Sequence, residues 1–389
     1  MQKKKIIHIV DTLCVGGREK IVIDICNNLN AEVFDVYIIT LTNDLNEIAG
    51  LINRNKVNLI ELPVDHSDLV GATTIFNFIK VKKLLTKKIK SINPDIIHTH
   101  SYLHRLLIIF SAIKSYSSTT AVYHTVHTSG MYYNPKTFSD YFKLRIEKLV
   151  LGILKPNLIS ISEIIHENNQ RLFKNQSKSI NYIPNGVNLE VFDKVKYSIQ
   201  PEDFGAKSDD IILTYVARFC WGKNHITLLK ALKIILETNS NVRLLLAGEG
   251  DTRKEIEAFI SENNLQRNVI LLGSISNIAE LLSISTIAVF PSEFEGFTLT
   301  LIEKMAMGLP VVASNNDIFT RLICHKENGM LFSMFDENDL ATCVLELLDD
   351  KVLYNKISEN SKLFSKQFSL ERMINEHESY YNLKKRSSI

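Results

Sequence analysis

Short apolar runs and longer segments of helical periodicity alternate along the whole chain. Such alternation is typical of βαβ units, which build parallel sheets covered by helices. In the first half the predicted strands are Ile6–Val10, Val36–Leu41, Val57–Leu62, Ile96–Thr99, Ala121–Thr125, Leu158–Ser162 and Ile180–Ile183. In the second half they are Ile211–Ala217, Val242–Ala247, Val269–Leu272, Ile287–Phe290 and Val311–Ala313. The pattern predicts an α/β protein with two Rossmann-like parallel sheets.

The chain is 389 residues long, which is too much for one ordinary core at about 150 residues per domain. Pro184-Asn185-Gly186 interrupts the pattern before a polar stretch, so we predict one domain over 1–184 and a second over 185–368. The tail, 369–389, has the apolar stripe of a helix that packs on a folded surface. That stripe consists of Leu370, Met373, Ile374, His377, Tyr380, Tyr381 and Leu383.

Composition narrows the class of protein. Lys and Arg number 45 against 43 Asp and Glu, a net charge of +2, so the chain as a whole is not a nucleic-acid binder. The five cysteines contain no paired CxxC, which argues against a disulfide framework or a structural zinc. The first apolar run is interrupted by His8 and ended by Asp11, and no window approaches the ~18 apolar residues of a membrane span. We expect a cytoplasmic protein, at most peripheral on the inner face of the cell membrane.

One segment favours such a surface location. Apolar residues interleave with lysines as in a basic amphipathic helix, which can lie on anionic lipid. An ordinary helix with a solvated face would have the same pattern. The lysines are Lys80, Lys82, Lys83, Lys87, Lys88 and Lys90.

Two glutamates mark the clearest candidate site. Glu295 lies in a glycine-containing turn after a buried strand, and Glu303 lies in the helix that follows. The start of such a helix presents unpaired N–H groups that bind anions at the carboxyl edge of a sheet. A carboxylate behind that point could accept hydrogen bonds from ribose hydroxyls. The alternative interpretation is that both glutamates are solvated helix charges.

Two cations form a second candidate. Arg218 ends the first strand of the second sheet, and Lys223 precedes the next helix. A guanidinium and an ammonium at a strand-to-helix junction can neutralise a diphosphate and stabilise its departure. A pair of solvated surface charges is the alternative.

The ordered motifs resemble those of bacterial group 1 glycosyltransferases, glycosyltransferase family 4. The resemblance covers almost the whole chain, from about Ile6 to the tail helix. It rests on Gly16-Gly17-Arg18-Glu19, Asp95-Ile96-Ile97-His98-Thr99-His100, Ile183-Pro184-Asn185-Gly186-Val187, Arg218 with Lys223-Asn224, Ala247-Gly248-Glu249-Gly250, and Glu295-Gly296-Phe297 through Glu303-Lys304-Met305-Ala306-Met307-Gly308-Leu309-Pro310. It implies the GT-B architecture: an N-terminal acceptor domain and a C-terminal nucleotide-sugar domain face each other across a cleft, and the last helix crosses back to the first domain.

The resemblance also implies roles for individual residues. Arg218 and Lys223 are expected to hold the diphosphate, Glu303 the ribose, and Glu295 hydroxyls of the donor sugar. His127 matches the family histidine near the reacting face of that sugar, so the expected catalytic set is His127, Arg218, Lys223 and Glu295. Further donor contacts are expected from Gly16, Gly17, Gly273, Gly296, Phe297, Thr298 and Leu299, and acceptor contacts from Gly17 and Asn185.

The pairs His98/His100 and His124/His127 also permit a metal site, but no third and fourth ligands can be nominated. We therefore predict neither a metal nor a cofactor. Lys304 stands where an alanine is usual, and we expect it on an exposed helix face. The stretch Asn315–Arg321 lacks the glycine-rich turn and glutamate often found there, which bears on the donor's identity.

The expected function is retaining transfer of a hexose or N-acetylhexosamine from a nucleotide diphosphate sugar, a UDP-sugar by preference. The expected acceptor is a surface polysaccharide or a lipid-linked saccharide. A nucleotide-sugar 2-epimerase and a non-catalytic partner subunit would share the fold. An NAD(P)-dependent oxidoreductase is disfavoured, because Arg253 stands at the third glycine position after Gly248-Glu249-Gly250.

Overall fold

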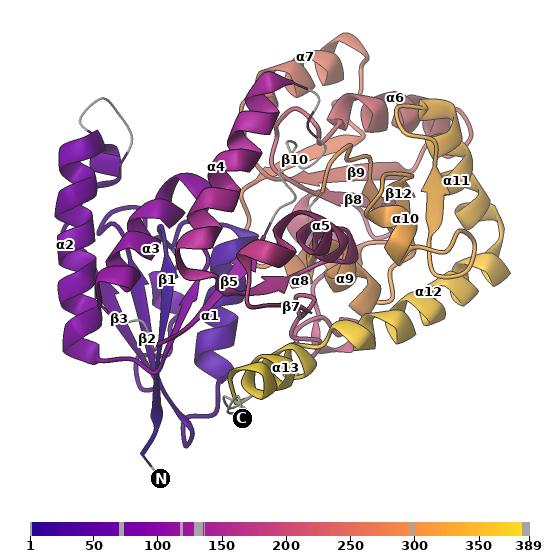
Figure 1. Cartoon of the computed structure of the whole chain (residues 1–389). Helices are drawn as coiled ribbons and strands as arrows, with labels where there is room; N and C mark the ends of the chain where they lie inside the picture. The colour runs from indigo at the N-terminus through magenta and orange to yellow at the C-terminus, as the bar shows by residue number, and fades with distance from the viewer. Residues whose placement is uncertain are drawn as a thin grey trace. The chain divides into compact units, whose positions relative to one another are not determined.

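The computed structural model describes residues 2–69, 74–116, 120–127, 135, 137–295 and 299–382. The chain forms two units: unit 1 is Met1–Gly186 with Leu370–Ile389, and unit 2 is Val187–Ser369 (Figure 1). The first division lies two residues after the predicted boundary at 184, and the second lies one residue after 368.

Unit 1 is built on a seven-stranded sheet in the order β3-β2-β1-β4-β5-β6-β7. Every neighbouring pair is parallel, so the chain returns through a connection after each strand. The strands are β1 Lys4–Val10, β2 Phe34–Thr40, β3 Val57–Glu61, β4 Ile96–Thr99, β5 Ala121–Val126, β6 Asn157–Ser160 and β7 Ser179–Tyr182.

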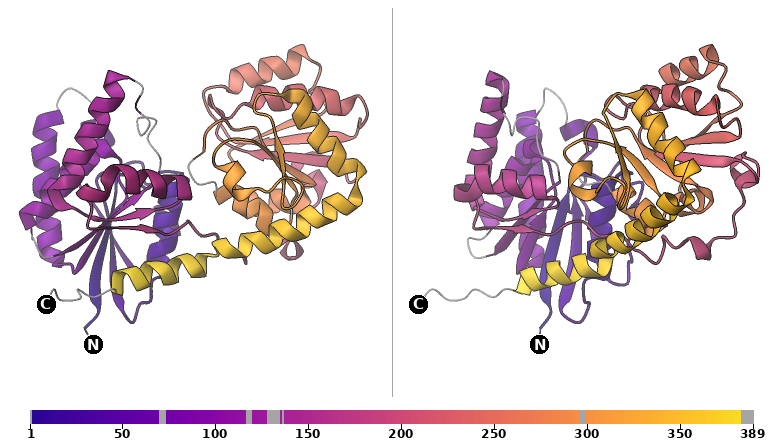
Figure 2. Two further views of the ribbon diagram at one scale, coloured as in Figure 1. Left: turned by 45° about the vertical axis from the view of Figure 1, so that its right-hand side comes forward. Right: turned by 90° about the vertical axis from the view of Figure 1, so that its right-hand side faces the viewer.

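Helices cover both faces of this sheet (Figure 2). On one face α2 packs on α3 and α3 on α4, whereas α1 and α13 contact each other on the other face. The helices are α1 Gly17–Asn28, α2 Thr74–Ile92, α3 Leu103–Tyr116, α4 Phe138–Leu154, α5 Glu163–Phe173 and α13 Leu370–Asn382. Single 3₁₀ turns occupy Ala49–Leu51, His66–Leu69 and Lys174–Gln176.

The tail helix α13 belongs to unit 1, although it follows unit 2 in sequence. Its buried face consists of Met373, Ile374, His377, Tyr380 and Tyr381, five of the seven predicted stripe positions. The rings of Tyr380 and Tyr381 each lie 5.1 Å from the ring of Tyr123 on β5, edge to face. The prediction that this helix packs on the first domain is confirmed; Leu383 lies outside the described residues.

Unit 2 has a six-stranded parallel sheet in the order β10-β9-β8-β11-β12-β13. The strands are β8 Ile211–Val216, β9 Val242–Ala247, β10 Val269–Gly273, β11 Ile287–Phe290, β12 Val311–Ser314 and β13 Met330–Phe332. The sequence pattern did not predict β13, because three residues are too few to establish a strand periodicity.

The helices of unit 2 pack against one another, and α11 contacts α12. α6 contacts α7 and α11, and α9 contacts α12. The helices are α6 His225–Leu236, α7 Arg253–Glu262, α8 Ile278–Ile284, α9 Leu299–Ala306, α10 Phe319–Leu322, α11 Glu337–Asp349 and α12 Lys351–Ser365. Single 3₁₀ turns occupy Lys194–Lys196, Pro201–Phe204 and Lys366–Phe368.

Helix α2 carries the predicted lysine-rich face. Its apolar positions Val81, Leu85 and Ile89 are fully buried within unit 1. These three side chains therefore pack within unit 1, whereas Ile79 on the same helix is 47% exposed. Across the described residues, no helix combines the length and apolar character needed to cross a membrane.

Candidate active site

Two loops at the carboxyl edge of the unit 2 sheet bring two of the predicted donor residues, Lys223 and Glu295, into contact. Arg218 follows β8 and is exposed to solvent. Lys223 ends the same loop, and its Nζ lies 2.6 Å from Oε1 of Glu295 in the loop after β11. The two side chains are only 22% and 13% exposed, so this is a largely buried ion pair. The structure thus joins a predicted phosphate ligand to the predicted sugar ligand.

Hydrogen bonds fix these loops to each other. The hydroxyl of Tyr215, at the end of β8, donates to the carbonyl oxygen of Lys223 at 2.9 Å and lies 2.9 Å from Oγ of Ser292. The amide of Glu293 donates to the carbonyl oxygen of Gly222 at 2.8 Å. Burial raises the pKa of Tyr215 well above its usual value, so the phenol stays protonated. These hydrogen bonds between the two loops therefore hold Lys223 opposite Glu295.

The loop after β9 approaches the loop after β8 closely. Gly248 and Gly250 have φ values of +146° and +154°, and a Cβ at these positions would overlap the carbonyl oxygens of Ala217 and Phe219. Only glycine fits such positions. Gly273, one of the predicted donor contacts, ends β10 at φ +66°, and its carbonyl oxygen accepts a 2.8 Å hydrogen bond from the amide of Gly248.

Helix α9 carries the other predicted donor residues. Leu299 begins the helix and Glu303 lies one turn further on, and both are partly exposed. Gly296, Phe297 and Thr298 lie outside the described residues.

The expectation that Lys304 is exposed is wrong: the side chain is 0% exposed. It shares the buried face of α9 with Leu301 and Met305. Its Nζ lies 4.5 Å above the centre of the Phe290 ring, a cation–π contact, and donates to the carbonyl oxygen of Thr300 at 3.3 Å. Lysine is seldom fully buried without a paired charge, which is why the sequence suggested exposure.

In unit 1, the loop after β1 leads into α1. Gly16 is the residue preceding the helix and has an extended backbone, with φ −172°, whereas Gly17 is exposed. A Cβ on Gly16 would lie 2.5 Å from Oε2 of Glu19. A larger residue at this position would therefore displace the Glu19 carboxylate from its present place.

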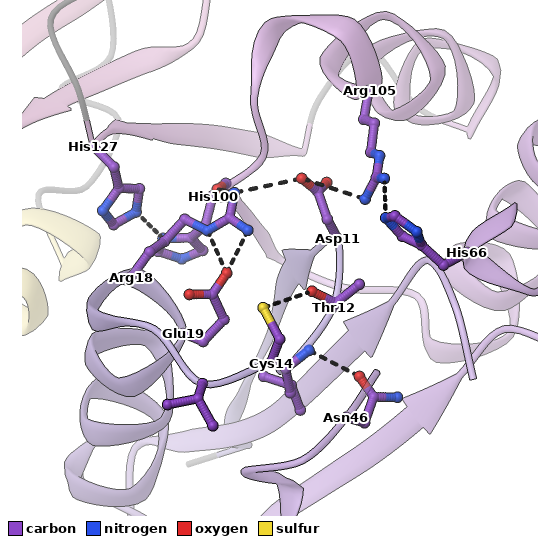
Figure 3. Close-up of polar contacts among 12 residues, drawn as sticks. Asp11, Thr12, Cys14, Arg18, Glu19, Asn46, His66, His100, Arg105 and His127 are labelled. Carbon is purple, nitrogen blue, oxygen red and sulfur yellow. Dashed lines mark hydrogen bonds and ion pairs between the residues drawn. The ribbon is translucent and has the colours of Figure 1, made fainter. Parts of the chain in front are cut away.

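Sequence reasoning missed a group of buried charges around this loop (Figure 3). Arg18 forms an ion pair with Glu19, and its Nη1 lies 3.4 Å from Oδ2 of Asp11. Arg105 lies 3.7 Å from the same carboxylate and bonds His66 at 2.9 Å. The partners come from distant parts of the chain, so only the position of Arg18 directly after Gly16-Gly17 could have suggested them.

His127 follows β5 and contacts His100 (Figure 3), and these two rings form a chain of imidazoles with His8. Its Nε2 lies 3.2 Å from Nδ1 of His100, whose Nε2 lies 3.1 Å from Nδ1 of His8. Burial lowers the pKa of His127 and of His100 well below the usual value, and lowers that of His8 to about 3. All three rings are therefore neutral at physiological pH.

Comparison with known protein families gives one match in each half of the chain. A family model described as Glycosyltransferase Family 4 matches residues 15–191, and one described as Glycosyl transferases group 1 matches residues 197–364. The chain belongs to the group 1, family 4 glycosyltransferases.

Curated relatives match most of the length of this glycosyltransferase. The UDP-Gal:alpha-D-GlcNAc-diphosphoundecaprenol alpha-1,3-galactosyltransferase of Escherichia coli is 27% identical over 72% of each chain. The N-acetylgalactosamine-N,N'-diacetylbacillosaminyl-diphospho-undecaprenol 4-alpha-N-acetylgalactosaminyltransferase of Campylobacter jejuni is 27% identical over 90% of this chain and 93% of its own. The structure of Anabaena HepE in complex with UDP and glucose matches with a TM-score of 0.79 at 18% identity, over 98% of this chain and 100% of that one. The predicted GT-B fold of two parallel-sheet units is confirmed.

The glycosyltransferase has one triad of potential metal-binding side chains among the residues the structure describes. Ring nitrogens of His8, His98 and His100 lie within 4.8 Å of one another. The two nitrogens of His98 lie 2.6 Å from the Tyr381 hydroxyl and 2.7 Å from the Thr125 hydroxyl, and His8 bonds His100. These contacts fit a hydrogen-bonded core cluster better than a ligand set, because ligand nitrogens must be free to face the metal.

Two further predicted residues have different surroundings. His124 is buried, with Nδ1 2.9 Å from the Thr99 hydroxyl and its ring edge-on to Phe110, so it belongs to the core. Asn185 is 5% exposed and directly precedes the end of the first segment of unit 1. Its predicted contact with an acceptor therefore needs a local rearrangement.

Proposed function

We propose that this glycosyltransferase moves a hexose or N-acetylhexosamine from a UDP-sugar, with retention of configuration, to a surface polysaccharide or a lipid-linked saccharide. The observation that carries the proposal is the largely buried ion pair of Lys223 with Glu295, in the same loop as the exposed Arg218. The names of the two curated relatives contain diphosphoundecaprenol acceptors, and one names UDP-Gal as donor.

In the proposed donor complex, Arg218 binds the diphosphate as a planar fork and Lys223 as a point charge. The N–H groups at the start of α9 face the same anion. Glu303 accepts hydrogen bonds from the ribose. Glu295 accepts them from the donor sugar, and its ion pair with Lys223 holds it in place at 2.6 Å.

The proposed reaction needs no protein nucleophile and no metal ion. The bond between the anomeric carbon and the diphosphate oxygen breaks, and the acceptor oxygen attacks from the face that the diphosphate leaves. The acceptor proton passes to the departing diphosphate oxygen, so atoms and charges balance. Arg218, Lys223 and the helix start stabilise the negative charge that develops there. The alpha linkage named for the Escherichia coli relative is the product expected when an α-linked sugar is transferred with retention.

In unit 1 we assign His127 to the donor sugar as a neutral hydrogen-bonding group. Its Nε2 is directed at His100, which leaves Nδ1 for a ligand. Gly16 and Gly17 would face the leaving phosphate, and Gly17 the acceptor. The lysines on α2 would hold the enzyme on the anionic inner face of the membrane, where a lipid-linked acceptor is found.

The test is thermal stabilisation by UDP, GDP, ADP and NAD in the presence of EDTA, for the wild type and Glu303→Ala. We expect UDP to raise the melting temperature of the wild type and not that of the variant, because the ribose contact is lost. Glu359→Ala, an exposed carboxylate on α12, is the matched control and should respond like the wild type.

The other outcomes separate the alternatives. Stabilisation by NAD alone would overturn the proposal. Stabilisation by UDP together with conversion of a UDP-sugar in the absence of an acceptor would indicate a 2-epimerase. Absence of any stabilisation would indicate a non-catalytic subunit.

A further inference from the structure

Lys304 is an anomaly in the donor unit. Its side chain is fully buried on an otherwise apolar helix face. An ammonium group has three N–H donors, and among the described residues one of them has a hydrogen-bond acceptor, the carbonyl oxygen of Thr300 at 3.3 Å. The Phe290 ring, 4.5 Å away, supplies a cation–π contact but no hydrogen-bond acceptor oxygen. The lysine is under-satisfied where it lies.

Lys304 belongs to the last turn of α9, and its side chain runs along the helix toward the first turn. Thr300 is the second residue of α9, so the side chain of Lys304 points back toward the helix start. Burial lowers the pKa of Lys304 to about 8, although Glu303 and Glu295 act in the opposite direction. Below that pH the buried charge reduces stability.

The charges that face Lys304 are two carboxylates and their partners. Glu303 precedes it on α9, and Glu295 comes from the loop after β11, where it bonds Lys223. β11 contributes the neutral Phe290. α12, which packs on α9, approaches Gly308 at the far end of the helix with Ser358 and Lys362.

These charges matter for an anionic ligand. Among the described residues predicted to contact the donor, Arg218 and Lys223 are cations and Glu295 and Glu303 are carboxylates, so these four charges sum to zero. A nucleotide diphosphate brought to a neutral site still meets two carboxylates, and their repulsion is strong where water is excluded. A third cation behind the helix start makes the site net positive.

We propose that Lys304 is a positioning residue of the donor site, whose buried ammonium offsets the two carboxylates and allows the donor diphosphate to bind beside them. This inference rests on the function proposed above. Binding of the diphosphate at the start of α9 adds a further anion to the two carboxylates that already act on the lysine. The stability lost by burying the charge is then partly recovered as affinity for the nucleotide.

The inference makes nucleotide affinity depend on pH. As pH rises through about 8, Lys304 loses its proton and the site loses its net positive charge. The affinity should then fall, by at most about tenfold per pH unit if only the protonated form binds. A lysine that serves only to fill space would leave the affinity unchanged over this range.

The experiment is calorimetric titration of UDP into the wild type, Lys304→Met and Lys304→Arg at pH 7 and pH 9. We expect wild-type affinity to fall about tenfold between these values, whereas Lys304→Met binds about tenfold more weakly at pH 7 and shows a smaller pH dependence. Lys304→Arg, which keeps its charge at both values, should retain its affinity at pH 9. Lys362→Met, an exposed lysine on α12, is the matched control for loss of one charge.

The stability of the free protein gives a second readout. Lys304→Met should melt at the same or a higher temperature than the wild type at pH 7, because it removes a buried charge, yet it should bind UDP more weakly. Equal UDP affinity of Lys304→Met and wild type, or equal pH dependence, would overturn the inference. If Lys304→Met does not fold, the comparison of the wild type with Lys304→Arg tests the inference. An equal loss of UDP affinity of both proteins between pH 7 and pH 9 would then overturn it. Failure of the wild type to bind any nucleoside diphosphate would instead overturn the proposed function.

Discussion

Lys223 is bonded to Glu295 in the structure, so an arriving diphosphate must share its ammonium with a carboxylate. Arg218, which is exposed, can bind phosphate without breaking that pair. The two cations are therefore not equivalent, although the sequence presents them as a pair. Charge-assisted contacts that strengthen as charge develops on a leaving group contribute mainly to the rate.

We predict that Arg218→Ala and Lys223→Ala each reduce kcat by about 10²-fold or more, by analogy with the loss of one oxyanion donor. Lys223→Ala should also lower thermal stability, because it leaves the largely buried Glu295 carboxylate unpaired. Steady-state transfer rates and melting curves measure both effects. Lys230→Ala, an exposed lysine on α6, should change neither. Near-normal transfer by both variants would remove the two cations from the mechanism.

For individual residues, the place in the fold was easier to predict from the sequence than the burial and the contacts of the side chain. Arg218, Lys223 and Glu295 lie at strand ends whose order could be read from the apolar runs, so their common sheet edge followed. The burial of Lys304 could not be read in this way, because a charged residue on an apolar helix face contradicts the usual preference. The contacts of Arg18 with Asp11 and of Asp11 with Arg105 depend on side-chain directions that no periodicity contains.

Elements buried on both faces were the easiest to predict. Parallel strands between two helix layers are nearly continuous apolar runs, and β1, β9 and β11 were recognised for this reason. β13 was missed because it is too short. The loops were the hardest, since the close approach of the loop after β9 to the loop after β8 depends on glycine conformations. A Gly-Glu-Gly sequence alone would also fit a cofactor-binding turn.

That close approach gives a prediction about an element. We expect Gly248→Ala to destabilise the protein by about 2 kcal/mol or more, because its Cβ would overlap the Ala217 carbonyl and φ is +146°. Gly152→Ala is the control: Gly152 lies in α4 with nothing within 4 Å of an added Cβ, so helix propensity should make it stabilising by up to about 1 kcal/mol. Urea denaturation of the three proteins measures the difference. A stable Gly248→Ala protein would mean that the two loops separate without cost.

On the scale of the whole molecule, the division into two units was predictable because Pro184-Asn185-Gly186 interrupts the strand pattern. The return of α13 to unit 1 followed from its apolar stripe together with the resemblance, since the stripe alone names no partner. The sequence could not predict the contacts of His100 with His8 and His127 in unit 1. These three histidines come from three different strands or strand ends.

The two units should respond differently to a nucleotide. If unit 2 holds the donor, UDP should slow amide hydrogen exchange after β8, after β11 and in the first turns of α9, because bound ligand suppresses local opening. If Gly16 and Gly17 face the leaving phosphate, amides at the start of α1 should also be protected, whereas those of α2 should exchange as before. Mass spectrometry of peptides from the wild type and Glu303→Ala, with and without UDP, measures this. Protection confined to unit 1 would show that our proposal places the nucleotide in the wrong unit. Protection confined to unit 2 would remove Gly16 and Gly17 from the donor site.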